Sequence, residues 1–296
     1  MSDICQNYDA VLLDQFGVLH DGKKPYSVRT IEAVRMMWEA GIQIFIISNS
    51  SRRSAGTIEK LKGLGYDDKW FSGAVTSGDM THQYLIQRPT EWWKSLGSCC
   101  VHLTWGSRGS ISLEGLGLQV VRDISSAEFI LVHGTQALGS PVGGQPKETS
   151  LDDIKLLLQD CSSLDLPMIV ANPDLVTVDG DDLAIMPGTL AKWYENMGGS
   201  TYLMGKPSSI IYGEAIGQLG GVDRNRVLAI GDSMEHDIAG GSKAGLDTLF
   251  LAGGIHALEL KAKLGKNCYD HERLRMLFAD YGTVPTYTSA FLSWNS

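Results

Sequence analysis

The sequence has no apolar run that approaches the roughly 20 residues needed to span a bilayer. Its first ten residues, MSDICQNYDA, also lack the basic segment and apolar core that mark a secretory signal. The five cysteines form no C-x-x-C pair, which argues against structural zinc and against a disulfide framework and fits reduced thiols. We therefore expect a cytoplasmic protein with no membrane partner.

Positive charge is also scarce. The formal net charge is −9 and no basic face is visible, whereas binding to a nucleic-acid backbone requires one, so we expect no nucleic-acid partner. An anionic small molecule would need a local positive site, made by a metal, a lysine or a helix N-terminus. With 296 residues, 43% of them hydrophobic, the chain is long enough for two folded domains, and the sequence leaves open whether it forms a homo-oligomer.

The chain is organised around the segment that follows Tyr8. Residues 10–13 form an unbroken apolar run, typical of a strand that is covered on both faces of a parallel sheet. Asp14 follows at its carboxyl end, where open α/β sheets bind their ligands, and Gly17 can supply a tight turn. Alone, this pattern fits an ordinary turn after a strand, but three later segments favour a functional site.

The flanking segments predict a doubly wound parallel α/β sheet. Ser27 can cap a helix that Gly41 ends, and Gly205-Lys206-Pro207 starts the second half of the sheet. The other expected elements are strands at 42–47, 73–76, 227–230 and 248–251 and helices at 54–64 and 208–219. The tail after Gly254 reads as helical to about residue 281 and then irregular.

The middle third of the chain carries its own pattern of strands and helices. We expect strands at 99–103, 129–132, 168–171 and 184–186. We also expect one helix that starts near residue 151 and another that spans 189–197. This pattern indicates a separate α/β domain inserted into the first, with domain boundaries at 1–77, 78–201 and 202–296.

Acidic residues at two strand ends suggest a metal site. Asp14 and Asp232 are the oxygen ligands that a hard cation prefers, and Mg²⁺ commonly takes one or two protein carboxylates. Asp237, at the start of the next helix, is close enough in sequence to orient a metal-bound water or Lys206. A carboxylate held in line with a phosphoryl group can also attack phosphorus, which makes Asp14 a candidate nucleophile.

Polar residues elsewhere complete a phosphate site. Ser48 and the adjacent segment Asn49 and Ser50 could hold phosphoryl oxygens at the end of the second strand. Lys206 could neutralise both the nucleophile and the transferring group. Asn172 and Asp174 in the insert could select the substrate, although a capped turn explains them equally well.

These segments, taken in order, resemble the four motifs of the haloacid dehalogenase (HAD) superfamily. The motifs are Asp14 to Leu19, Ser48, Lys206, and Gly231 to Asp237. The position of the insert, together with the segments NPD at 172–174 and GKP at 205–207, resembles the NagD-like class IIA branch with a C2-type cap. The resemblance implies a HAD-type Rossmannoid core, Mg²⁺-dependent hydrolysis of phosphate monoesters, and a metal held by Asp14, Asp232 and the main-chain carbonyl of Phe16.

One position departs from the family pattern. Phosphatases of the family carry an aspartate two residues after the nucleophile, where it protonates the leaving oxygen, and this chain has Phe16. His20 could supply an acid near neutral pH or could simply be solvated beside a glycine turn. The departure leaves two alternatives to a phosphatase: a catalytically weak phosphate-binding or regulatory protein, or a dehalogenase or phosphonatase.

Overall fold

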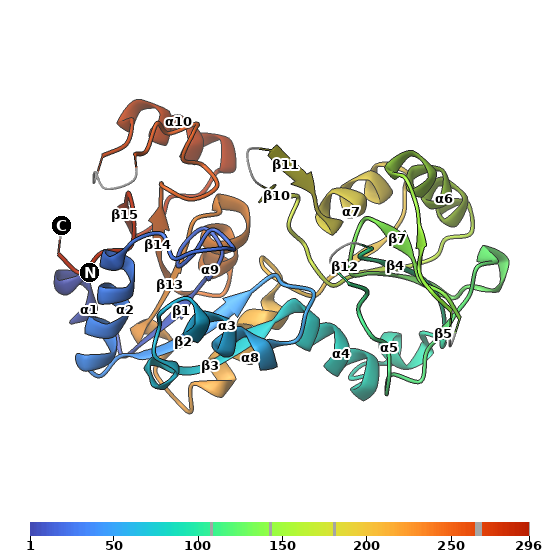
Figure 1. Ribbon diagram of the computed structural model, residues 1–296, viewed down its shortest axis with the longest axis horizontal. Coiled ribbons are helices and arrows are strands. Elements are labelled where there is room, and N and C mark those ends of the chain that lie inside the picture. The colour runs from blue at the N-terminus through green and yellow to red at the C-terminus, as the bar shows by residue number, and fades with distance from the viewer. Residues whose placement is uncertain (107–108, 142–143, 180–181, 264–267, 296) are drawn as a thin grey trace. The chain divides into compact units, whose positions relative to one another are not determined.

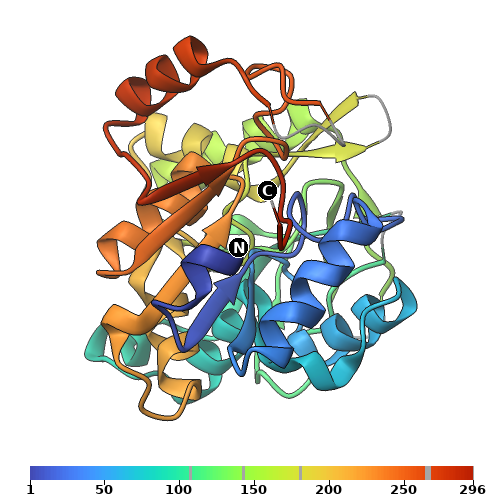
Figure 2. The same cartoon turned by 90° about the vertical axis from the view of Figure 1, so that its left-hand side faces the viewer.

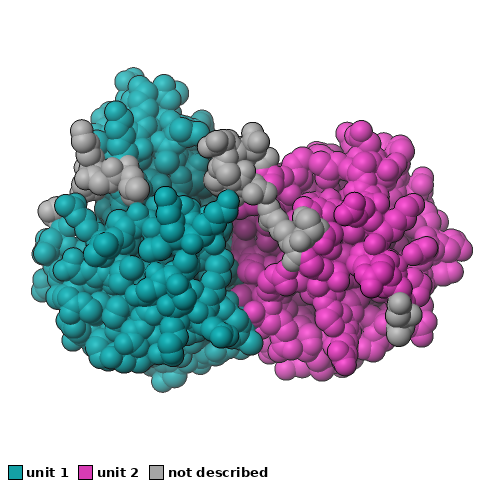
Figure 3. Space-filling view, in the orientation of Figure 1, with its two compact units in different colours: residues 1–48, 54–75, 206–296 teal, residues 49–53, 76–205 magenta. Residues whose placement is uncertain are grey.

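The computed structural model describes residues 1–106, 109–141, 144–179, 182–263 and 268–295. The chain divides into two compact units, coloured separately in Figure 3. Unit 1 comprises Met1–Ser48, Ser54–Val75 and Lys206–Ser296, and unit 2 comprises Asn49–Arg53 and Thr76–Gly205. The segment 78–201 expected from the sequence to be an insert lies within the long stretch of unit 2.

Unit 1 is built on a six-stranded sheet in the order β15-β14-β13-β1-β2-β3. The pairs β1–β2, β1–β13, β13–β14 and β14–β15 are parallel, which confirms the doubly wound α/β class. Figure 2 faces this unit and shows β15 in red beside β14 in orange. The strands are β1 (Ala10–Leu13), β2 (Gln43–Ser48), β3 (Phe71–Thr76), β13 (Val227–Gly231), β14 (Asp247–Leu251) and β15 (Tyr287–Ser289).

The helices of unit 1 bury both faces of this sheet. On one face Val11 and Ile44 pack with Val34 and Met37 of α2 (Val28–Glu39), and the residues that follow them, Leu12 and Phe45, are equally buried on the other face. The Ser27 side chain caps α2 by accepting a hydrogen bond from the Thr30 amide, as expected from the sequence. The remaining helical segments are α1 (Ser2–Cys5), η1 (Ser54–Gly56), α3 (Thr57–Gly63), η2 (Asp68–Trp70), α8 (Ser209–Gln218), η4 (Arg224–Arg226), a π-helical turn η5 (Met234–Ile238), α9 (Ala239–Lys243) and α10 (His271–Tyr281).

The C-terminal tail differs from the sequence prediction. Within its described residues, the only helix is α10, so the long helix expected from 254 is wrong, and β15 is an added strand where irregular structure was expected. The Ile255 amide donates a hydrogen bond to the Asp232 carboxylate, and this bond holds the chain in turns after β14. Asp270 then caps α10 by accepting from two backbone amides, so the helix begins there.

Unit 2 contains a seven-stranded sheet in the order β12-β9-β6-β4-β7-β8, with β5 paired to β4, and a separate antiparallel pair of β10 and β11 (Figure 1). Its strands are β4 (Cys99–Thr104), β5 (Gln119–Val120), β6 (Phe129–Val132), β7 (Ala137–Leu138), β8 (Lys147–Glu148), β9 (Met168–Val170), β10 (Val176–Asp179), β11 (Asp182–Ile185) and β12 (Thr201–Leu203). Its helices are α4 (Ser77–Gln87), α5 (Glu91–Ser95), η3 (Ile124–Ser126), α6 (Leu151–Ser163) and α7 (Pro187–Asn196). No helix in the described part of the chain is both long and apolar enough to cross a membrane.

Two histidines are buried side by side in the sheet of unit 2. His102 of β4 and His133, directly after β6, are each 4% exposed, and Nε2 of His102 lies 3.1 Å from Nδ1 of His133. Burial lowers the pKa of His102 to about 4 and that of His133 well below its usual value. Both rings are therefore neutral at pH 7, and one of them donates the shared proton to the other.

Candidate active site

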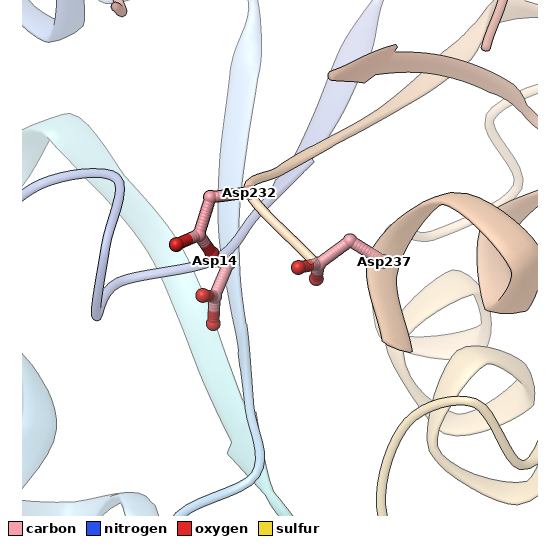
Figure 4. Close-up of side chains that lie close together, drawn as sticks. All are labelled: Asp14, Asp232 and Asp237. Atoms are coloured by element: carbon pink, nitrogen blue, oxygen red, sulfur yellow. The ribbon is translucent and has the colours of Figure 1, made fainter. Parts of the chain in front are cut away.

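Three carboxylates meet at the carboxyl ends of β1 and β13. Asp14 follows β1, Asp232 follows β13, and Asp237 lies on the π-helical turn η5. One oxygen from each can be chosen so that the three atoms lie within 4.8 Å of one another, and all three residues are buried. Figure 4 shows the carboxylates turned toward one another. The parallel pairing of β1 with β13 accounts for this meeting, because parallel strands end at the same edge of a sheet.

Lys206 bridges two of these carboxylates. Its Nζ donates to Oδ1 of Asp14 and to Oδ1 of Asp237, at 2.7 Å in each case, and the residue is only 2% exposed. Burial disfavours the charged amine, but Asp14 and Asp237 outweigh burial and hold the pKa of Lys206 well above its usual value. The lysine is therefore charged at neutral pH and fixes the position of the Asp14 carboxylate.

Asp232 is enclosed by backbone. The Ile255 amide donates to its Oδ2 at 2.7 Å, and the turn at Gly17 passes so close that a Cβ there would lie 2.0 Å from that oxygen. Gly17 also has a φ of +86°, so both its conformation and its neighbour require glycine. Burial raises the pKa of Asp232 well above its usual value, and the charges of Asp14 and Asp237 act in the same direction.

The donor set and charge of this cluster suit a hard divalent cation. Three buried carboxylates face the single positive charge of Lys206, and uncompensated buried charge is costly. Carboxylate oxygens are the ligands that Mg²⁺ and Ca²⁺ prefer. The residues that are present therefore fit a bound divalent metal.

Ser48 has a neighbour that the sequence analysis did not single out. The Gln15 side chain, 7% exposed, donates from Nε2 to the Ser48 Oγ at 2.8 Å. Strand register could have revealed this pair: β1 and β2 align Leu13 with Ile46, and two residues further along each strand are Gln15 and Ser48. The site thus includes a buried amide next to the candidate nucleophile.

Phe16 and His20 pack against each other in the turn after Asp14. Their ring centroids are 5.7 Å apart with the ring planes nearly perpendicular. His20 is 1% exposed, and burial lowers its pKa to about 4, so neither the expectation of a solvated histidine nor that of an acid near neutral pH is correct. The chain folds back here, since the Gly17 amide donates to the His20 carbonyl, and this fold buries the ring. The Gly22 amide donates to Nδ1 of His20, so the proton of the neutral ring is on Nε2.

The four predicted substrate-binding residues belong to unit 2. The Asn49 side chain donates to Asp174 Oδ1 at 2.8 Å, and the Asp174 amide donates to Asn172 Oδ1 at 2.9 Å. The Ser50 hydroxyl accepts from the Arg52 amide and its carbonyl from the Gly78 amide. Asn49, Asn172 and Asp174 therefore form one hydrogen-bonded set, and the bond from the Asp174 amide to Asn172 stabilises the turn after β9.

Two family models match most of the chain between them. Residues 11–119 match the haloacid dehalogenase-like hydrolase model, and residues 203–271 match the HAD-hydrolase-like model. These matches contain Asp14, Ser48, Lys206, Asp232 and Asp237.

Individual relatives are similar over almost their whole length. Chronophin of Bos taurus is 26% identical over 275 residues, covering 88% of this chain and 86% of its own. An acid sugar phosphatase of Staphylococcus aureus (strain USA300) is 22% identical over 262 residues, covering 86% of this chain and 90% of its own. A crystal structure of a haloacid dehalogenase-like hydrolase from Brucella suis 1330 superposes with a TM-score of 0.75 at 28% identity, covering 97% of each chain. This chain therefore belongs to the haloacid dehalogenase superfamily of hydrolases, in its NagD-like phosphatase branch.

Proposed function

We propose that the protein is a Mg²⁺-dependent phosphatase that hydrolyses a small phosphorylated metabolite through an aspartyl phosphate on Asp14. The observation that carries this proposal is the buried bridge from Lys206 to Asp14 and Asp237, with Asp232 beside it. This arrangement fixes a carboxylate beside a buried cation at the end of a strand, as covalent catalysis requires. The phosphatase among the relatives supports a small phosphorylated substrate, and we propose a cytoplasmic location.

The metal would be held by Asp14, Asp232 and the main-chain carbonyl of Phe16, with Asp237 placed to orient it. A bound Mg²⁺ would neutralise charge on the phosphoryl group and on the buried carboxylates. The proposed ligand at this position is the main-chain carbonyl, which every residue type has. The presence of Phe16 in place of aspartate therefore does not remove a metal ligand.

The residues of the chain can perform a two-step displacement. In the first step an oxygen of Asp14 forms a bond to phosphorus as the bond to the leaving oxygen breaks. In the second step water attacks the phosphorus, releasing phosphate and restoring the carboxylate. Lys206 stabilises the charge on the nucleophile and on the transferring group, and Ser48 binds a phosphoryl oxygen.

We further propose that unit 2 is a cap domain of the C2 type and that it supplies substrate contacts. Asn49, Ser50, Asn172 and Asp174 are the candidate residues. The bond from Asn49 to Asp174 supports a shared role, because it joins the segment after Ser48 to the NPD turn within one unit.

Metal removal tests the proposed activity directly. With a panel of phosphorylated metabolites and an aryl phosphate, we expect turnover with Mg²⁺, loss of turnover after chelation, and recovery when Mg²⁺ is restored. Full activity after exhaustive chelation would contradict the proposal. Tight binding of phosphate without turnover of any ester would instead favour the alternative of a catalytically weak binding protein.

The lack of an acid at Phe16 predicts a strong dependence on the leaving group. Neither Phe16 nor the buried, neutral His20 can protonate a departing oxygen at pH 7, so aryl and acyl phosphates should react far faster than alkyl phosphates. Phe16→Asp should raise kcat/KM for alkyl esters selectively, because it supplies a general acid. We expect a gain of up to about 10²-fold, the lower end of what general acid catalysis contributes.

Phe16→Asn is the matched control, since it removes the ring without adding an acid. It should leave the ratio of aryl to alkyl rates unchanged. Equal wild-type rates on both kinds of ester, with no gain in Phe16→Asp, would show that another group supplies the proton.

A further inference from the structure

We propose that Gln15 is a positioning residue that orients the Ser48 hydroxyl toward the phosphoryl group. The side-chain amide of Gln15 lies 2.8 Å from the Ser48 Oγ, and both residues are at least 93% buried. The inference rests on the proposed function, in which Ser48 binds a phosphoryl oxygen.

Two hydrogen bonds hold the backbone of Gln15 in the turn after β1. Its carbonyl accepts hydrogen bonds from the amides of Leu19 at 2.9 Å and His20 at 3.2 Å. The residue also follows β1 at the level where Ser48 ends β2, as the Leu13 and Ile46 pairing requires. Because both partners extend from paired strands, the amide and the hydroxyl meet in a fixed geometry.

The direction of this hydrogen bond gives it a consequence for phosphate binding. The NH₂ group of Gln15 can only donate hydrogen bonds, so the Ser48 Oγ accepts from it through one of its lone pairs. The hydroxyl proton of Ser48 must then point away from Gln15. A phosphoryl group presents acceptor oxygens, so a hydroxyl that is already turned to donate is prepared to bind it.

Two substitutions of similar size separate positioning from packing. Gln15→Met keeps an unbranched side chain that fills the space but removes the donor. Gln15→Glu keeps the shape but accepts a hydrogen bond from the Ser48 hydroxyl, which reverses the direction of the bond, and it adds a negative charge. Gln43→Met, at the exposed beginning of β2, is the matched control.

Each substitution is made both in the wild-type protein and in Ser48→Ala. For every resulting protein, kcat, KM and competitive inhibition by inorganic phosphate are measured. We expect Gln15→Met to weaken kcat/KM and phosphate inhibition about 10-fold, the effect of one hydrogen bond to a charged site. Gln15→Glu should weaken both by about 10²-fold or more, and Gln43→Met should change neither. In Ser48→Ala, Gln15→Met should cost less than about 2-fold, because its partner is already absent.

Three results would overturn the proposal. These are wild-type kinetics in Gln15→Glu, wild-type kinetics in Gln15→Met, and equal losses from Gln15→Met with and without Ser48. If Gln15→Met does not fold, the nearly isosteric Gln15→Glu decides alone. A wild-type protein that hydrolyses no phosphate ester would overturn the proposed function and this inference together, whereas an active wild type with indifferent Gln15 variants overturns only the inference.

Discussion

Replacing Asp14 by asparagine should reduce turnover by at least about 10⁴-fold, the order of loss that follows removal of a residue from a covalent catalytic centre. An asparagine fills nearly the same volume and still offers its side-chain oxygen to Lys206, but it cannot form the acyl phosphate. The substitution also removes a buried carboxylate whose charge disfavours the charged form of Asp232, so the metal-free protein should be at least as stable as the wild type. Steady-state kinetics and thermal unfolding measure the two effects.

Asp9→Asn provides the matched control for this variant. Asp9 directly precedes β1, at the opposite end from Asp14, and forms a surface ion pair with Arg226 at 2.6 Å. Such exposed pairs contribute about 0–1 kcal/mol, so its loss should leave turnover unchanged. Retention of most of the activity in Asp14→Asn, on any ester that the wild type hydrolyses, would show that Asp14 is not the nucleophile.

Lys206→Met should impair both catalysis and folding. We expect kcat to fall about 10²- to 10³-fold, because the lysine stabilises charge in the transition state. Without metal, the free energy of unfolding should also fall by about 3–5 kcal/mol, because two buried carboxylates lose the cation that bridges them. Saturating Mg²⁺ should restore part of the stability, since a ligand that binds only the folded state stabilises it.

The exposed Lys243, in the last turn of α9, allows a matched change of Lys to Met in the same unit. Lys243→Met should alter neither kcat nor the unfolding midpoint. If Lys206→Met kept wild-type stability in the absence of metal, the three carboxylates would not need this lysine for charge compensation.

The core of the fold could be predicted from the sequence because its strands are continuous apolar runs between turn residues. Residues 10–13, 129–132 and 227–230 were expected as strands and are β1, β6 and nearly all of β13. The parallel arrangement then indicates that Asp14 and Asp232 lie close together at one edge. To predict that these two residues are close, one needs to know only the topology of the sheet.

The elements that were missed carry a weak local signal. The edge strand β15 is three residues long and half-buried, so neither its length nor its pattern distinguishes it from a loop. Helix α4 begins at a capping box in which Thr76 and Asp79 bond to each other's backbone amides, and this T-x-x-D signal was available in the sequence. Few apolar residues follow it, which explains why the helix was not expected.

Within the site, contacts that depend on how a turn folds back could not be predicted. A histidine near glycines is commonly exposed, but the turn from Gln15 to His20 closes on itself and buries the ring. The partner of Ser48 depends on strand register, which is a relation between two segments and not a property of either. Residue types at strand ends are thus easier to assign than the contacts that tune them.

The buried pair of His102 and His133 sets a lower pH limit for unit 2. An unfolded histidine takes up a proton near pH 6.5, whereas His102 in the folded unit does so only near pH 4. As the pH falls between these values, the unfolded chain gains protons that the folded unit does not, so about 3 kcal/mol of stability is lost through His102 alone. An acidic branch in the pH dependence of turnover would then include this loss of stability in unit 2 and would not report the chemistry of the active site alone.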